Sequence, residues 1–266
     1  MLVLLNTNMN SVSNTRRPAV LLLGGTSEAG AIASHLATHP DLKLISSLAG
    51  RVAHPKLPTG QTRIGGFGGV EGLITYLQQE KIQIVIDATH PFAANISRNA
   101  AAACQRLGIP LISYVRPPWT PQQGDHWQDV PDLEAAAALT RSYHRIFLAI
   151  GRQELAPFAT CIHPWFLIRT IDQPDVPLPP NAKLILARGP FHLADELRLL
   201  KAHAIDCIIS KNSGGPATYD KLEAARILGL PVIMVDRPTP PTNNVHTIEA
   251  VLSQISTELG RLITKY

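Results

Sequence analysis

A buried strand that runs directly into a glycine turn and a helix most constrains how this chain can fold. The segment is residues 20–30, VLLLGGTSEAG. A helix that begins at Thr26 or Ser27 directs free backbone N–H groups at the space above the strand, which suits a phosphate. The match to the dinucleotide fingerprint is imperfect, because Ser27 stands where the middle glycine is expected. A nucleotide-binding α/β domain is therefore predicted, with a tight turn that binds no ligand as the alternative.

The second expected strand, residues 43–48, indicates which dinucleotide the turn would take. An NAD site has a carboxylate roughly 20 residues past the glycine turn, yet no Asp or Glu occurs between Leu42 and Val70. The hydroxyl of Ser47 and the guanidinium of Arg51 are found there instead, and both suit the additional phosphate of NADP. The sequence therefore favours NADP over NAD, although a solvated loop arginine is the competing interpretation of Arg51.

Composition limits the class of protein. The 266 residues, 45% of them hydrophobic, suffice for two α/β domains with real cores. No apolar run approaches the roughly 20 residues of a membrane span. Residues 1–17 are expected to be a disordered tail and not a secretory signal, because their basic pair follows the apolar run instead of preceding it. Three widely spaced cysteines fit reduced thiols in the cytoplasm. A net charge of +4 with only 17% charged and 5% aromatic residues predicts neither a nucleic-acid nor a membrane partner.

Strand and helix patterns alternate along the chain, which is typical of mostly parallel sheets with helices on both faces. A proline-dense stretch at residues 116–121 interrupts the pattern and marks a domain boundary. We expect an α/β fold of two Rossmann-like lobes with mostly parallel sheets and a cleft between them. The first lobe is an NADP-binding domain over residues 18–116, and a second α/β domain over residues 117–266 completes the substrate cleft. The expected strands are 19–23, 43–48, 83–86, 109–115, 146–150, 165–170, 184–188, 206–210 and 231–235. The expected helices are 28–38, 70–79, 93–107, 132–142, 191–203, 218–228 and 247–263.

Ligands of open parallel sheets bind beyond the carboxyl ends of the strands, so residues that follow strands are candidates for the site. After the strand at 83–86, Thr89 is expected to cap a helix, and Asp87 to hold the turn by accepting backbone hydrogen bonds. His90 is a candidate proton donor or carboxylate ligand, with a structural histidine before a proline as the alternative. The cofactor-binding candidates are Gly24, Gly25, Thr26, Ser27, Glu28, Ser47, Arg51, Gly66 and Thr89.

The second half of the chain places cations, hydroxyls and glycines after its strands. Residues 210–215, SKNSGG, suit a phosphate or carboxylate, but the lysine precedes the glycines, which excludes a nucleoside-triphosphate P-loop. Three arginines at equivalent positions favour a polyanionic ligand over solvated surface. The substrate-binding candidates are Arg152, Arg188, Ser210, Asn212, Ser213, Gly214 and Arg237, and Lys211 joins His90 as a catalytic candidate. The ten dispersed histidines predict no metal site.

Taken together, these turns resemble those of the precorrin-6A reductase family of cobalamin biosynthesis, from about Ala19 to Pro238. The motifs that carry the resemblance are LGGT at 23–26, SLAGR at 47–51, GGFGG at 65–69, DATHPFA at 87–93 and SKNSGG at 210–215. The resemblance implies an oxidoreductase that uses NADPH to reduce a macrocyclic double bond, from precorrin-6A or its cobalt form to the 6B level. It also implies a macrocyclic polycarboxylate as substrate and hand-over to neighbouring enzymes of the pathway.

Reduction of such a macrocycle requires a hydride at one ring carbon and a proton at its neighbour. His90, Lys211 and ordered water remain open as the proton donor. Two other interpretations also remain. A different NADP-dependent reductase or epimerase would normally supply a Tyr-x-x-x-Lys pair, which the sequence lacks. A non-catalytic NADP sensor would not need the second set of basic turns.

Overall fold

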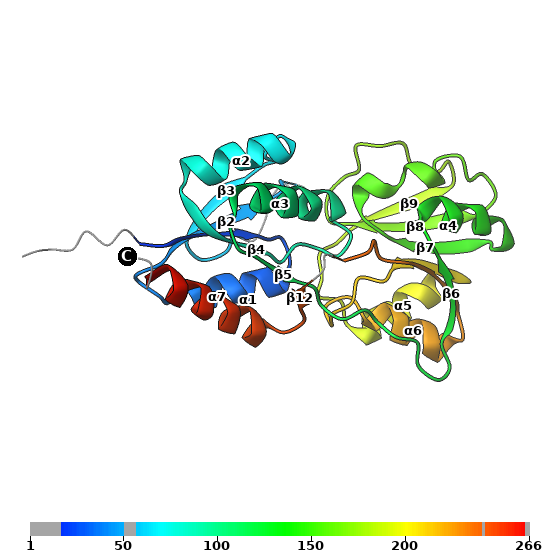
Figure 1. The fold of residues 1–266 in the computed structure, drawn as a ribbon. Helices are drawn as coiled ribbons and strands as arrows, with labels where there is room; N and C mark the ends of the chain where they lie inside the picture. The colour runs from blue at the N-terminus through cyan, green and yellow to red at the C-terminus, as the bar shows by residue number, and fades with distance from the viewer. Residues whose placement is uncertain (1–16, 51–56, 241–242, 264–266) are drawn as a thin grey trace, which may run out of the picture.

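Two six-stranded sheets lie side by side, each with helices on both faces (Figure 1). The computed structural model describes residues 17–50, 57–240 and 243–263. Every recorded strand pairing is parallel. The expected α/β fold of two parallel-sheet lobes is therefore confirmed, while the predicted disordered tail falls, except for Arg17, outside the described residues.

The first sheet has the strand order of a dinucleotide-binding fold, with a topological switch between β1 and β4. Its strands in spatial order are β12 (Asn244–Val245), β5 (Leu111–Tyr114), β4 (Ile82–Asp87), β1 (Ala19–Leu23), β2 (Lys43–Leu48) and β3 (Gln61–Ile64). One face is covered by α1 (Ser27–Leu36) and α7 (Ile248–Ile263), and the other by α2 (Gly69–Gln79) and α3 (Ala94–Leu107). The carboxyl ends of β1 and β4 thus form the edge at which a ligand is expected.

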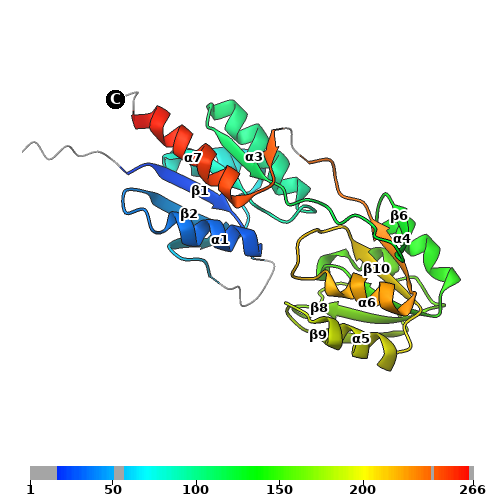
Figure 2. The same cartoon turned by 90° about the horizontal axis from the view of Figure 1, so that it is seen from below.

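The second sheet repeats this order when its strands are counted from β7, with β6 in the last place. Its strands in spatial order are β6 (His126–Val130), β11 (Pro231–Val235), β10 (Cys207–Lys211), β7 (Arg145–Ala149), β8 (Trp165–Thr170) and β9 (Ala182–Leu186). Its helices are α4 (Leu133–Leu139), α5 (Leu193–Ala202) and α6 (Asp220–Leu228), with short 3₁₀ turns η1 (Thr140–Ser142), η2 (Arg152–Glu154) and η3 (Ala156–Phe158). Figure 2 shows α5 and α6 together on one side of this sheet. Its switch point lies between β7 and β10.

The chain crosses between the lobes twice. After β5 it enters the second sheet at the edge strand β6, and after β11 it returns to the first sheet as β12. Helix α7 then packs on α1, where Val251 and Ile255 are buried in the same core as Val20 and Leu22. The expected second domain over residues 117–266 is therefore corrected: its last part, from β12 onward, belongs to the first lobe.

Three strands were not predicted from the sequence: β3, β6 and β12. Each lies at the edge of its sheet, and their side chains are mostly half-buried or exposed. An edge strand packs against little of the core and needs no continuous apolar run, so it leaves a weak pattern. The central strands β1 and β4, by contrast, are almost entirely buried and match their predicted positions closely.

One cluster of charges is buried beneath the second sheet's helices. Arg169 is paired with Glu196, whose side chains are 9% and 1% exposed. Lys221, in α6, lies close by with 4% exposure. Its Nζ donates to the carbonyl oxygen of Thr218 at 2.8 Å and lies 4.7 Å from the centroid of the Trp119 ring. Desolvation, reinforced by the positive charge of Arg169, lowers the pKa of Lys221 to about 7.

Lys221 is expected to make stability depend on pH above neutrality. Because its pKa is about 7 in the folded protein and 10.5 ordinarily, the unfolded chain binds more protons between these values. The free energy of unfolding therefore rises with pH in that window, by about 2 kcal/mol between pH 7 and 9. In Lys221→Met this rise should disappear, which urea unfolding at both pH values would measure. The exposed Lys201→Met is the control, and an unchanged rise in Lys221→Met would contradict the assignment.

Candidate functional site

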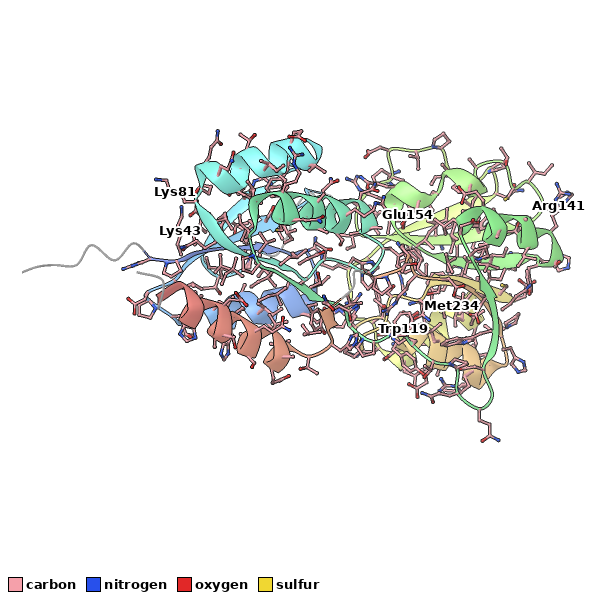
Figure 3. All side chains as sticks on the ribbon, in the orientation of Figure 1. Lys43, Lys81, Trp119, Arg141, Glu154 and Met234 are labelled. Carbon is pink, nitrogen blue, oxygen red and sulfur yellow. The ribbon has the colours of Figure 1, made fainter. Side chains whose placement is uncertain are left out.

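The switch points of the two sheets meet across the boundary between the lobes. The turn after β4 carries His90 and Phe92, and β10 ends at Lys211. Lys211 Nζ lies 4.8 Å from the centroid of the Phe92 ring, which itself packs against the core of the second lobe. Figure 3 labels Glu154, the ion-pair partner of Lys211, on the part of the second lobe that borders the first. Phe92 thus lies next to both predicted catalytic residues, because its ring centroid is also 5.9 Å from that of His90.

The glycine turn after β1 is tightly fixed to its neighbours. Thr26 is the N-cap of α1: its Oγ1 accepts from the Ala29 N–H at 3.1 Å and donates to the Ala88 carbonyl at 2.8 Å. The Gly24 N–H donates to the Ser47 carbonyl oxygen at 2.9 Å. Gly25 has a φ of +111°, and no described atom lies within 4 Å of where its Cβ would project. The turn therefore combines a rigid backbone with open space at the start of a helix.

Glu28, a predicted cofactor ligand, joins the two lobes. Its two carboxylate oxygens both accept from Arg116 Nη1 at 3.1 Å, and Ser27 Oγ donates to Glu28 Oε2 at 3.2 Å. Burial opposes ionisation of this carboxyl, but the charge and hydrogen bonds of Arg116 outweigh it and hold the pKa of Glu28 below its ordinary value. Arg116 Nε also donates to the Ser213 carbonyl at 2.7 Å. Arg116 was not singled out in the sequence because it lies in a proline-rich connector.

The edge formed by β2 and β3 contains a second arginine that sequence reasoning missed. Arg63 Nη1 donates to Ser47 Oγ at 3.1 Å and to the Gly65 carbonyl at 2.7 Å, and Nη2 donates to the Gly66 carbonyl at 2.9 Å. Parallel pairing of a strand through residues 61–64 with the second strand would have placed it there. The predicted Arg51 lies outside the described residues.

In the turn after β4, the predicted role of Asp87 is confirmed and the predicted helix cap at Thr89 is wrong. Asp87 Oδ1 accepts from the N–H and the hydroxyl of Thr89 at 3.1 and 2.7 Å, so Asp87 holds the turn as expected. Helix α3 begins at Ala94, within one residue of its predicted start, but its N-cap is Ala93, so the prediction that Thr89 caps a helix is wrong. His90 Nδ1 accepts from the Phe92 N–H at 3.2 Å. When the ring is neutral, its proton is therefore on Nε2.

Lys211 and Glu154 form a partly buried ion pair on the second-lobe side, with side-chain exposures of 11% and 26%. Glu154 Oε2 also accepts from the Gly151 N–H at 3.0 Å. Arg152, which follows β7 as predicted, donates from Nη1 to the Gln173 carbonyl at 3.0 Å and to Asp175 at 3.1 Å. The predicted Arg188 follows β9 and is exposed.

Other predicted substrate-binding residues hold the connector between β5 and β6. Arg237 donates to the carbonyls of Asn212, Arg116 and Pro117 at 2.6, 2.6 and 3.1 Å. The Asn212 side chain exchanges hydrogen bonds with the backbone of Trp119 at 2.8 and 3.0 Å. Burial, together with the charge of Arg116, lowers the pKa of Arg237 to about 10. The side chains of Arg237 and Asn212 thus form hydrogen bonds with the backbone of the protein itself.

The other substrate-binding candidates of residues 210–215, which are Ser210, Ser213 and Gly214, also contact neighbouring backbone groups of the protein. Ser210 is buried, and its Oγ lies 3.3 Å from the Lys211 carbonyl, while Ser213 Oγ lies 3.3 Å from the same oxygen. A Cβ on Gly214 would lie 2.1 Å from the Pro117 carbonyl oxygen. The absence of a side chain at Gly214 therefore allows the close approach of the connector.

A cavity of about 750 Å³ lies between the lobes. Its walls include Glu28 and Tyr114 from the first lobe, Arg116 and Trp119 from the connector, and Tyr219 from the second lobe. Figure 3 labels Trp119 at this boundary. The cavity thus lies beside α1 and the connector, and its lining includes neither His90 nor Lys211.

The sequence model of a protein family described as Precorrin-6x reductase CbiJ/CobK matches residues 19–256. The chain belongs to this family. The resemblance drawn from the motifs is thereby confirmed, and NADPH is the cofactor of this family of oxidoreductases. The two other interpretations, an unrelated NADP-dependent reductase and a non-catalytic sensor, are set aside.

Relatives within the CbiJ/CobK family span nearly the whole chain. A precorrin-6A reductase of Rhodococcus erythropolis is 50% identical over 90% of this chain and 97% of its own. One from Rhodobacter capsulatus is 47% identical over 89% and 95%. A cobalt-precorrin-6A reductase of Priestia megaterium is 26% identical over 88% and 96%. A solved structure of CobK precorrin-6A reductase has 45% identity and a TM-score of 0.85, covering 91% of this chain and 97% of the other.

Among residues 17–50, 57–240 and 243–263, no group of three His, Cys, Asp or Glu side chains is arranged to hold a metal ion. Within the same residues, no helix is long and apolar enough to cross a membrane.

Proposed function

We propose that this chain uses NADPH to reduce metal-free precorrin-6A to the 6B level, in the cleft between its two lobes. The observation that carries the choice of substrate is the gap in identity between two groups of relatives. Precorrin-6A reductases are 47–50% identical to this chain, whereas cobalt-precorrin-6A reductases are 25–27% identical.

The first lobe has the features of a dinucleotide site. Gly25 leaves open space at the N-terminus of α1, where backbone N–H groups and the helix dipole favour a pyrophosphate. Gly24 and Thr26 hold this turn against β2 and β4, and Ser27 lies at the start of the helix. When bound, NADPH supplies the hydride. We assign Ser47 and Gly66 to the adenosine side and Thr89 to the nicotinamide side, because Ser47 lies at the carboxyl end of β2, and Gly66 and Thr89 follow β3 and β4.

Lys211 and His90 are the proposed proton donors, and they come from opposite lobes. Glu154 holds the Lys211 ammonium beside Phe92, which keeps a proton at a fixed position on the second-lobe side. His90 is fixed through Nδ1, so that the Nε2–H of the neutral ring is the one that can be donated. Arg152 and Arg188, which also follow strands, are the proposed contacts of the substrate's carboxylates.

The remaining predicted ligands have a supporting place in this proposal. Glu28, Asn212, Ser213, Gly214 and Arg237 take part in contacts between the lobes and the connector. We propose that these residues maintain the shape of the cleft, and that they contact the substrate only through backbone groups. Ser210 is buried and is assigned the same supporting role.

The function is tested by mixing the purified protein anaerobically with NADPH and either precorrin-6A or its cobalt form. Loss of nicotinamide absorbance together with a change in the macrocycle spectrum is expected with the metal-free substrate. Faster oxidation with the cobalt form would overturn the choice of substrate. No oxidation with either form, despite NADPH binding, would overturn the proposed function.

The proton donor is tested in single turnovers. Lys211→Met and His90→Gln are each compared with the exposed Lys201→Met, which should react at the parental rate. Loss of a general acid is expected to slow the step by about 100-fold, with unchanged affinity for NADPH and an altered pH profile. If both variants keep the parental rate and pH profile, neither residue is the donor.

We further infer a cytoplasmic enzyme that passes its product to the next enzyme of the pathway. Cys104 and Cys207 support the first part, because both are free and buried, and burial raises the pKa of each thiol to about 12. Such thiols suit a reducing compartment. The second part follows from the substrate class, since a biosynthetic intermediate is made and consumed by other enzymes.

A further inference from the structure

We propose that Arg63 binds the 2′-phosphate of NADPH and thereby sets the preference for NADPH over NADH. The inference rests on the cofactor site proposed above and adds to it a residue that sets specificity. It comes from the contacts of one arginine on the edge strand β3.

Arg63 lies where the additional phosphate of NADPH is expected. In a sheet of this topology, the ribose next to adenine lies at the carboxyl end of the second strand, here β2. Arg63 is paired in register with Ser47, the penultimate residue of β2, and its Nη1 donates to the Ser47 hydroxyl. The guanidinium therefore lies at the end of β2 although it belongs to the neighbouring strand.

The guanidinium is held in a fixed orientation. Its carbon lies 3.9 Å from the centroid of the Phe67 ring and 5.0 Å from that of Tyr76. Phe67 in turn packs against Tyr76 of α2, with ring centroids 5.2 Å apart, and the absence of a side chain at Gly72 allows its backbone to approach α2 closely. Such a platform orients the planar group at little entropic cost when a phosphate binds.

The charge of Arg63 is not neutralised by an acid within the described residues. Its three recorded hydrogen bonds go to a hydroxyl and two backbone carbonyls, all uncharged, and no carboxylate forms an ion pair with it there. Among contacts with the described residues, these three bonds leave the Nε–H group and one hydrogen of Nη2 for a ligand.

The surroundings exclude the alternative of a site for NAD. No Asp or Glu occurs between Leu42 and Val70, so nothing in this stretch competes with a phosphate for the guanidinium or takes the ribose hydroxyls as an NAD site does. The loop at residues 65–69 adds only glycines and Phe67, which leaves its backbone accessible to a ligand.

The test compares two fragments of the cofactor by calorimetry. The probes are 2′,5′-ADP, which carries the 2′-phosphate, and 5′-AMP, which lacks it. We expect Arg63→Met to weaken binding of 2′,5′-ADP by about 10- to 100-fold, as for loss of a charged hydrogen bond. Binding of 5′-AMP should change less than about twofold. Arg98→Met, on the exposed side of α3, is the matched control and should bind both probes normally.

Three further results decide between explanations. Arg63→Lys, which keeps the charge but not the planar fork, should give an intermediate loss, and it replaces Arg63→Met if that variant does not fold. Arg51→Met tests the other arginine of this region: if it carries the loss and Arg63→Met does not, the assignment to Arg63 is overturned. If the parental protein fails to prefer 2′,5′-ADP over 5′-AMP, the proposed cofactor site itself is wrong.

Discussion

Replacing Glu196 with leucine is expected to lower the free energy of unfolding by about 3–5 kcal/mol. Arg169 Nη1 and Nη2 donate to the two carboxylate oxygens of Glu196 at 2.5 and 3.2 Å, and both side chains are almost fully buried. The guanidinium also stacks 3.5 Å from the centroid of the Phe191 ring. Removal of Glu196 alone leaves this cation buried without a partner, near the ammonium of Lys221. Urea unfolding at pH 7 would measure the loss.

The double variant Arg169→Met with Glu196→Leu is the control for this prediction. It removes both charges and fills their volume with apolar atoms, so it should recover most of the lost stability. A double variant as unstable as the sum of the two single variants would show that the pair is not coupled, and the explanation from an unpaired charge would then fail.

Gly214→Ala is expected to destabilise the protein by about 3 kcal/mol and to displace the connector between the lobes. The new Cβ would lie 2.1 Å from the Pro117 carbonyl oxygen and 2.3 Å from Arg237 Nη2. The backbone of the connector must therefore move, which breaks the hydrogen bond between Arg237 and Pro117. Because Arg116 holds Glu28 from the same connector, the two lobes should lose their alignment and reductase turnover should fall.

Gly229→Ala separates this clash from backbone strain. Gly214 and Gly229 both have a φ of +66°, but no described atom lies within 4 Å of a Cβ at Gly229. Gly229→Ala should therefore cost only about 1 kcal/mol for the left-handed conformation and leave turnover unchanged. Calorimetric melting and steady-state rates of the two variants would be compared. Equal losses in both would mean that the contact with Pro117 contributes nothing.

Much of the architecture could be predicted because central strands and their helices leave strong patterns. The buried strand β1, the glycine turn and the capping Thr26 indicate the first unit directly. The return of α7 to the first lobe could not be predicted in this way. An amphipathic helix shows that one face is buried, but its sequence does not say which sheet covers that face, and the two-residue strand β12 is too short to reveal its partner.

The site was predictable in position more than in detail. Residues after strands were predicted to form the site, and two of them, His90 and Lys211, both contact Phe92. The partners of the arginines were not predictable. The sequence does not distinguish an arginine that binds backbone carbonyls, such as Arg237, from one that binds a phosphate. The carbonyls come from segments that are distant in the sequence.

The double crossing between the lobes also sets the order in which they are completed during synthesis. The second lobe has all six strands once Val235 has left the ribosome, whereas the first still lacks β12 and α7. Until then the apolar face formed by Val20 and Leu22 lacks Val251 and Ile255 as cover. The lobe that is translated first is therefore the last to complete its core. One apolar face of its sheet stays partly uncovered while the second lobe, which is an insertion in the first, folds.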